Sequence, residues 1–163
     1  MPEGNRFGVW LVVAALLVGI YFIRADGISQ PAPDFSLLKD YGGRVDLASY
    51  RGRPVLLVFW TSSCSICQHE LPMLSRLAPE FASKGVDIVA INLGGADEGR
   101  DYMRTNRIDL TSVADSDGEV GRAYHVSGVP KLVLVGSDGK IKRTSAGWAN
   151  ESTLRDWMNS AGG

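Results

Sequence analysis

The residues with the clearest chemical potential are Cys64 and Cys67, the only 2 cysteines in the 163-residue chain. They stand in the segment FWTSSCSICQHELPML, with two residues between them. Such a pair can form a structural disulfide, contribute half of a metal site, attach haem, or act as a redox-active dithiol. The neighbouring residues, and the elements that position the two sulfur atoms, favour some of these chemistries over others.

The rest of the sequence gives little support to three of these possibilities. Covalent haem attachment needs Cys-x-x-Cys-His, but Gln68 takes the histidine position and His69 follows one residue later. A structural disulfide across two residues closes too short a loop to restrict the unfolded chain much. A zinc site usually needs a second pair of ligands, and the only histidines are His69 and His125. A copper site formed by both thiolates and one histidine stays open as an alternative.

The elements predicted around the cysteines favour the redox-active dithiol. Residues 54–60 (PVLLVFW) are typical of a strand buried on both faces, and a helical pattern follows them. Cys64 is therefore expected to open a helix, where free backbone N–H groups favour a thiolate and lower the pKa of a cysteine. Cys67 would lie one turn into the helix, where it can resolve a mixed disulfide formed at Cys64.

Apolar periodicity and turn residues further along the chain predict an α/β domain with a mixed sheet. Residues 86–93 are expected to form a second buried strand. Two hairpins are predicted, at residues 35–47 and 131–144, and three later helices, at residues 97–106, at residues 119–124 and after Asn150. The order of these elements indicates parallel strand pairs inside the sheet and an antiparallel hairpin at one side.

The N-terminal residues differ in character from the rest of the chain. Residues 7–23 (FGVWLVVAALLVGIYFI) are uncharged, and as a helix of roughly 26 Å they can cross a bilayer core. We therefore expect a cytoplasmic N-terminus at residues 1–6, a transmembrane signal anchor at residues 7–23, a linker at residues 24–33 and one domain at residues 34–163. A cleaved signal peptide is the alternative for the apolar run.

The charge is balanced, with 17 basic and 18 acidic residues and a formal net charge of −1. This balance provides no overall basic field, so nucleic acid is not an expected partner. Gly94 and Gly95 lack the spacing of a nucleotide-binding loop. Asp115, Asp117 and Gly118 lack the later ligands of a calcium-binding loop, and we expect a turn there.

Several motifs together resemble the membrane-tethered, thioredoxin-like oxidoreductases of the TlpA/ResA/CcmG group, which is related to the AhpC/TSA superfamily. The matching pieces are PDFSL, LASYRGRPVLLVFW, the Cys-x-x-Cys pair, Glu70, Pro72 and YHVSGVP. The resemblance implies a thioredoxin-like fold, in which helices flank a central mixed β-sheet. It also implies an N-terminal hairpin and a central insertion at residues 97–124.

The resemblance also implies which residues act. Cys64 and Cys67 are expected to exchange electrons with protein thiols and disulfides. Glu70 matches a carboxylate that assists proton transfer near the second cysteine, although a solvated residue favoured by the helix dipole is nearly as compatible. Val129 and Pro130 match a cis-proline position that shapes the groove for the partner's backbone. No organic cofactor and no metal are expected, because the two sulfur atoms carry the electrons.

The family resemblance predicts a single-pass cell-membrane protein whose catalytic domain faces the extracytoplasmic, periplasmic side. There it is expected to act as a protein-disulfide reductant that receives electrons from a membrane dithiol protein, with cytochrome c maturation as one role. Two other functions stay open. The first is a peroxiredoxin-type thiol peroxidase that uses Cys64, because Thr61 and Cys64 form a T-x-x-C motif. The second is a copper-binding chaperone module.

Overall fold

The structure is a computed structural model of the chain, and it describes residues 30–161. From Pro31 onward these residues form one compact unit. The predicted cytoplasmic N-terminus, the predicted anchor at residues 7–23 and most of the predicted linker lie outside the described residues. In the part of the chain that is described, no helix combines the length and the apolar character needed to cross a membrane.

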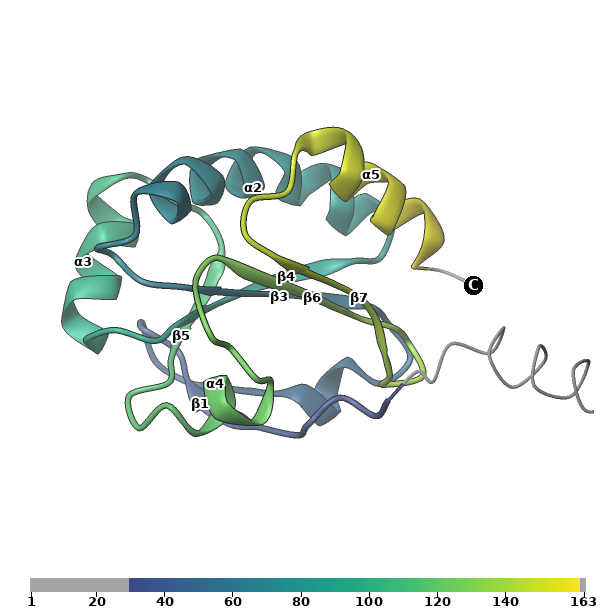
Figure 1. The fold of residues 1–163 in the computed structure, drawn as a ribbon, viewed down its shortest axis with the longest axis horizontal. Coiled ribbons are helices and arrows are strands. Elements are labelled where there is room, and N and C mark those ends of the chain that lie inside the picture. The colour runs from purple at the N-terminus through teal and green to yellow at the C-terminus, as the bar shows by residue number, and fades with distance from the viewer. Residues whose placement is uncertain (1–29, 162–163) are drawn as a thin grey trace, which may run out of the picture. The chain divides into compact units, whose positions relative to one another are not determined.

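A five-stranded sheet forms the centre of the domain, in the spatial order β5-β4-β3-β6-β7 (Figure 1). Its strands are β3 (Val55–Trp60), β4 (Asp87–Asn92), β5 (Thr111–Ala114), β6 (Lys131–Val135) and β7 (Ile141–Ala146). Strands β3, β4 and β5 pair in parallel, whereas β6 runs antiparallel to both β3 and β7. This arrangement confirms the predicted α/β class and the predicted antiparallel hairpin at one side of a mixed sheet.

Strand β5 was not expected from the sequence. Its four residues, TSVA, contain no long apolar run, and only Ser112 and Val113 are buried. The strand forms because its backbone pairs with β4, and because Lys39 makes an isolated antiparallel bridge to Val113. Tertiary pairing therefore extends the sheet where the local sequence carries little strand signal.

Helices and a small hairpin cover the two faces of the sheet (Figure 1). One face carries α2 (Ser65–Ser83), α3 (Ala96–Thr105) and α5 (Glu151–Ser160), and the other carries β1 (Ser36–Leu38), β2 (Arg44–Asp46), the 3-10 helix η1 (Leu47–Tyr50) and α4 (Glu119–Ala123). Successive side chains of β3 point to opposite faces, so Val58 and Trp60 join one core while Leu57 and Phe59 join the other. The strand is fully buried on both sides, which explains the continuous apolar run in its sequence.

The central insertion at residues 97–124 holds most of α3, all of β5 and all of α4. Asp115 is buried in the turn before α4, and its carboxylate accepts hydrogen bonds from the backbone N–H groups of Val120 (3.2 Å) and Gly121 (2.7 Å). Gly118 takes the left-handed conformation that this turn requires, with φ of 69°. The structure thus confirms that this acidic segment is a turn, and it assigns Asp115 to the start of α4.

Candidate active site

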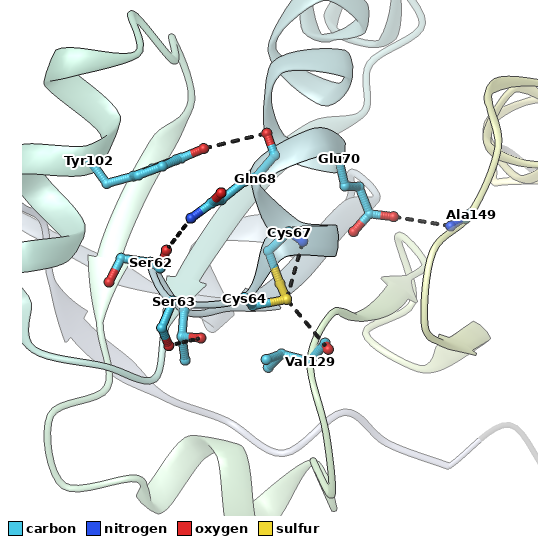
Figure 2. The surroundings of a disulfide bond; sticks show 10 residues. Ser62, Ser63, Cys64, Cys67, Gln68, Glu70, Tyr102, Val129 and Ala149 are labelled. Carbon is cyan, nitrogen blue, oxygen red and sulfur yellow. Dashed lines mark hydrogen bonds between the residues drawn. A yellow bond between two sulfur atoms is a disulfide. The ribbon is translucent and has the colours of Figure 1, made fainter.

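The two cysteines lie where β3 leads into α2, and they form a disulfide with 5.2 Å between their Cα atoms (Figure 2). Cys64 is the N-cap residue of α2, and its Sγ accepts a hydrogen bond from the backbone N–H of Cys67 at 3.1 Å. Cys67 lies in the first turn and is only 1% exposed, whereas Cys64 is partly exposed. Cys64 is therefore the more exposed cysteine of the pair, and Cys67 is enclosed by the protein.

The start of α2 also provides favourable electrostatics for a thiolate at Cys64. The helix is 19 residues long, and its first turn contains no acidic residue. Its free backbone N–H groups and its dipole place partial positive charge beside the Cys64 sulfur. Partial positive charge of this kind stabilises a thiolate, which is the form in which a cysteine attacks a disulfide.

Side chains from α2 and α3 hold the loop that precedes Cys64. The side-chain amide of Gln68 donates a hydrogen bond to the backbone oxygen of Ser62 at 2.8 Å. The Tyr102 hydroxyl donates a hydrogen bond to the backbone oxygen of Gln68 at 3.4 Å. The Tyr102 ring also packs against Trp60, with 5.5 Å between the ring centroids. Our sequence analysis did not assign Gln68 or Tyr102 to the site. The Tyr102 contact joins residues 34 apart in the chain, whereas Gln68 and Ser62 are only 6 residues apart.

The loop before β6 brings the other predicted site residues to the disulfide. The Val129 carbonyl oxygen lies 3.6 Å from Cys64 Sγ, and the Val129–Pro130 peptide bond is cis, as the family resemblance implied. Pro130 is buried and Val129 is partly buried. The ammonium group of Lys131 donates hydrogen bonds to the carbonyl oxygens of Tyr124 (2.7 Å) and His125 (2.9 Å), and so fixes the start of this loop.

Glu70 lies one helical turn after Cys67 and is completely buried. Its Oε1 accepts a hydrogen bond from the backbone N–H of Ala149 at 3.0 Å, while Oε2 has no hydrogen-bond partner among the described residues. Burial raises the pKa of Glu70 to about 7, although the hydrogen bond from Ala149 opposes this shift. The interpretation of Glu70 as a solvated surface residue was therefore wrong. A carboxyl group with a pKa near neutrality can accept or donate a proton at physiological pH.

Residues 147–149, which follow β7, were not expected at the site. The backbone N–H of Gly147 donates to the Pro130 carbonyl oxygen at 2.8 Å, and Ala149 donates to Glu70 as described above. Figure 2 shows this segment beside the start of α2, with Glu70 directed toward Ala149. Glu70 and Ala149 are 79 residues apart in the chain, so no local pattern in the sequence could have joined them.

Two observations concern the alternative functions, thiol peroxidase and copper binding. A peroxidase would use the Thr61 hydroxyl to orient the peroxide, and Thr61 Oγ1 lies 3.4 Å from Ser63 Oγ. A copper site would need a third ligand. Within residues 30–161, no three side chains among His, Cys, Asp and Glu come together in a way that could hold a metal ion.

Comparisons with known proteins agree with this geometry. The model of the AhpC/TSA family matches residues 28–144. The chain is 34% identical over 161 residues to thiol-disulfide oxidoreductase ResA of Bacillus subtilis strain 168, covering 94% of this chain and 90% of the relative.

Two solved structures share the fold. A Chlorobium tepidum protein assigned as a thiol:disulfide interchange protein DsbE is 27% identical, with a TM-score of 0.76 over 82% of this chain and 96% of that chain. A secreted Mycobacterium tuberculosis disulfide oxidoreductase homologous to Escherichia coli DsbE is 26% identical, with a TM-score of 0.67 over 77% of this chain and 95% of that chain.

Proposed function

Since the chain belongs to the AhpC/TSA family and is a ResA-like thiol-disulfide oxidoreductase, we propose that it reduces disulfides of client proteins on the extracytoplasmic side of the membrane. One observation carries this proposal. The cysteine pair stands at the start of α2, with Cys64 partly exposed and Cys67 enclosed by the protein. That asymmetry supports a mechanism in which Cys64 attacks and Cys67 resolves.

The exchange proceeds in two displacements at sulfur. The Cys64 thiolate attacks one sulfur of the client disulfide, forms a mixed disulfide and releases the other client sulfur as a thiolate. The Cys67 thiolate then attacks Cys64 Sγ, closes the internal disulfide and releases the second client thiolate. Two electrons pass from the protein to the client, and a membrane dithiol protein returns the pair to its reduced state.

The groups around the sulfurs have roles in these steps. Cys67 must lose a proton before it attacks, and Glu70 is the proposed acceptor because it lies one turn away and has a pKa of about 7. Val129 and Pro130 are the proposed contact for the client's backbone, because the Val129 carbonyl lies beside Cys64 Sγ. The four sulfur atoms account for all the electrons, so the reaction needs no organic cofactor.

Three arguments support an extracytoplasmic location. Residues 7–23 form an uncharged run that can anchor the protein in a membrane. Disulfides form and persist in oxidising compartments, where a disulfide reductant has substrates. One of the structural relatives is described as secreted.

By family resemblance, cytochrome c maturation is one role of this activity, with apocytochrome c among the clients.

The proposal can be tested by trapping clients with the Cys67→Ser variant in the native host. Without the resolving thiol, the mixed disulfide at Cys64 should accumulate, and mass spectrometry should identify the attached proteins. We expect extracytoplasmic proteins that carry cysteine pairs. The matched control is the double variant Cys64→Ser and Cys67→Ser, which should trap nothing. Clients found only in the cytoplasm would contradict the proposed location, and equal trapping by the control would contradict the role of Cys64.

A further inference from the structure

Three segments meet around the disulfide, and none of them contains a charged residue. They are residues 61–68 (TSSCSICQ), residues 126–130 (VSGVP) and residues 146–150 (AGWAN). The second segment contacts the first through the Val129 carbonyl oxygen, 3.6 Å from Cys64 Sγ. The third contacts the second through the hydrogen bond from Gly147 to the Pro130 carbonyl at 2.8 Å. These three segments therefore offer a client an uncharged surface beside Cys64.

Two large apolar side chains on these segments stay in contact with water. Ile66, between the two cysteines, is 48% exposed, and Trp148 is 56% exposed. Trp148 belongs to neither hydrophobic core cluster of residues 30–161. A tryptophan side chain buries about 150–250 Å² when it is enclosed, so this exposure leaves on the order of 100 Å² for contact with another molecule.

The position of Trp148 is fixed from both sides. Its preceding neighbour, Gly147, is hydrogen-bonded to Pro130, and its following neighbour, Ala149, is hydrogen-bonded to Glu70 at 3.0 Å. Both partners belong to the site: Pro130 adjoins Val129, and Glu70 lies one turn after Cys67. The backbone of Trp148 is thus held next to the site while its indole remains accessible. A contact that is already ordered before binding loses less conformational entropy when the client arrives.

We propose that Trp148 is a specificity-determining residue that binds an apolar side chain next to the client's cysteine. The occupant is an extended client segment, because the client sulfur must reach Cys64 while its flanking residue reaches Trp148. Tryptophan is among the residues that most often dominate binding energy at interfaces. Because the surrounding segments are uncharged, selection among clients rests on apolar contact and depends little on salt. This inference rests on the proposed reductant function and names the class of client.

The test uses synthetic peptides joined as disulfide-linked homodimers, with Leu or Gly next to the single cysteine and no charged residue. The reduced protein converts each dimer into two peptide thiols while its own dithiol becomes a disulfide, and acid quenching with chromatography gives the second-order rate constant. We expect the Leu peptide to react about tenfold faster than the Gly peptide, the ratio expected for a contact of about 1.4 kcal/mol. Salt between 0.05 M and 0.5 M, concentrations chosen to vary screening severalfold, should change the Leu rate constant by less than about twofold.

Variants then assign the preference to Trp148. Trp148→Ala should lower the Leu-to-Gly ratio to between about one and two, and Trp148→Phe should keep most of it because the ring still offers apolar area. The matched control is Tyr41→Ala. Tyr41 is 70% exposed and comes two residues after Lys39, which makes a β-bridge to β5 at one edge of the sheet. Trp148 follows β7, which is the opposite edge strand. This control should leave the ratio unchanged.

Each result decides between two claims. If the wild type reduces the Leu and Gly peptides at equal rates, or if both Trp148 variants keep the full preference, the inference about Trp148 is wrong while the reductant function stands. A Leu rate constant that falls severalfold with salt would also contradict the inference. If the reduced wild type reduces neither peptide, the proposed reductant function itself fails.

Discussion

Glu70 is a carboxylic acid enclosed by the protein beside a redox-active pair, and its protonation couples the fold to the proposed chemistry. Only one of its two oxygen atoms has a hydrogen-bond partner among the described residues, the backbone N–H of Ala149. Burial disfavours the charged form more than this hydrogen bond favours it, so the pKa rises from 4.5 to about 7. Near neutral pH the group can therefore accept the Cys67 proton that the resolving step releases.

The raised pKa of Glu70 predicts how stability depends on pH. The folded state binds the proton up to pH of about 7, whereas an unfolded glutamate releases it near 4.5. The free energy of unfolding should therefore fall as the pH rises through this window, by at most about 3.4 kcal/mol at roughly 1.36 kcal/mol per pKa unit. Glu70→Gln should lack this decline. Urea unfolding of both oxidised proteins from pH 4.5 to 8 measures the difference, and parallel curves would show that Glu70 titrates normally.

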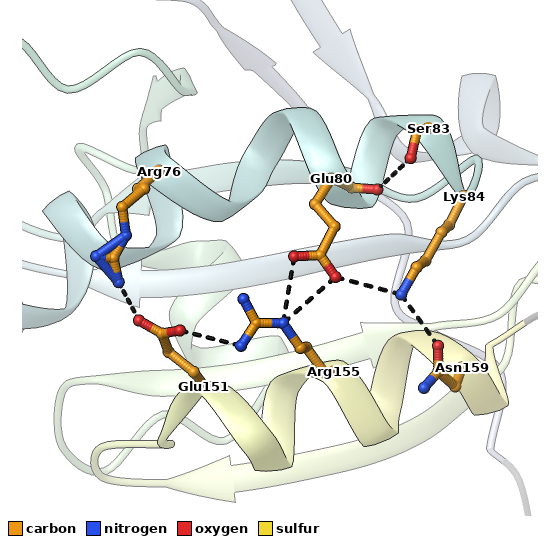
Figure 3. A network of polar contacts seen from close by, with 7 residues as sticks. All are labelled: Arg76, Glu80, Ser83, Lys84, Glu151, Arg155 and Asn159. Carbon is orange, nitrogen blue, oxygen red and sulfur yellow. Dashed lines mark hydrogen bonds and ion pairs between the residues drawn. The ribbon is translucent and has the colours of Figure 1, made fainter.

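At the scale of elements, α2 and α5 are joined by polar contacts on the outside and by apolar packing beneath (Figure 3). The polar network consists of Arg76, Glu80, Lys84, Glu151, Arg155 and Asn159. The ion-pairing side chains are between 36% and 62% exposed, so solvent screens each pair. Leu154 and Met158 of α5 are buried against the same core as α2. Apolar packing is therefore the main force that holds α5 in place.

This distinction predicts unequal effects of two neighbouring substitutions in α5. Leu154→Ala should lower the free energy of unfolding by about 2–5 kcal/mol, because it leaves a cavity in the core. Arg155→Ala should lower it far less than Leu154→Ala, because solvent screens the ion pairs of Arg155 with Glu80 and Glu151. Urea denaturation at pH 7 tests both variants side by side. A loss from Arg155→Ala as large as that from Leu154→Ala would mean that the ion pairs hold the helix.

The elements that could be predicted from the sequence are those with strong local signals. The apolar run before Cys64 predicted β3, and Asn150 predicted the start of α5, where its side chain accepts a hydrogen bond from the Thr153 N–H at 2.9 Å. Strand β5 escaped prediction because its pairing with β4 and with Lys39, and not its local sequence, makes it a strand. The burial of Glu70 also escaped prediction, because residues 147–149 cover it from a distant part of the chain. Local patterns thus predict elements, and long-range packing decides how a side chain such as Glu70 titrates.

At the scale of the whole domain, the chain enters at the end of the sheet opposite the disulfide. Ala32 donates a hydrogen bond to the Gly139 oxygen at 3.0 Å, in the turn between β6 and β7. Strand β3 runs away from that turn for 6 residues before the chain reaches Cys64, a distance of about 20 Å at about 3.3 Å per residue. Ala32, near the start of the described residues, thus lies at the end of the sheet far from the cysteines.

The proposed topology predicts the behaviour of a reporter fused after Gly163. A reporter that works only outside the cytoplasm should be active in intact cells, because the uncharged residues 7–23 would carry the domain across the membrane. The matched control deletes residues 7–23 and should abolish that activity at equal expression. Activity of a strictly cytoplasmic reporter on the full chain would contradict the proposed location.

The most direct test of the central claim, that Cys64 attacks and Cys67 resolves, compares the two single-cysteine variants with a disulfide-containing client protein in vitro. Non-reducing gels and mass spectrometry measure the mixed disulfide that each variant forms at pH 7. Cys67→Ser should accumulate a one-to-one mixed disulfide through Cys64, because Cys64 is the more exposed cysteine and no resolving thiol remains. Cys64→Ser should form little, because Cys67 is enclosed. Equal accumulation by the two variants, or a mixed disulfide through Cys67 alone, would contradict the account.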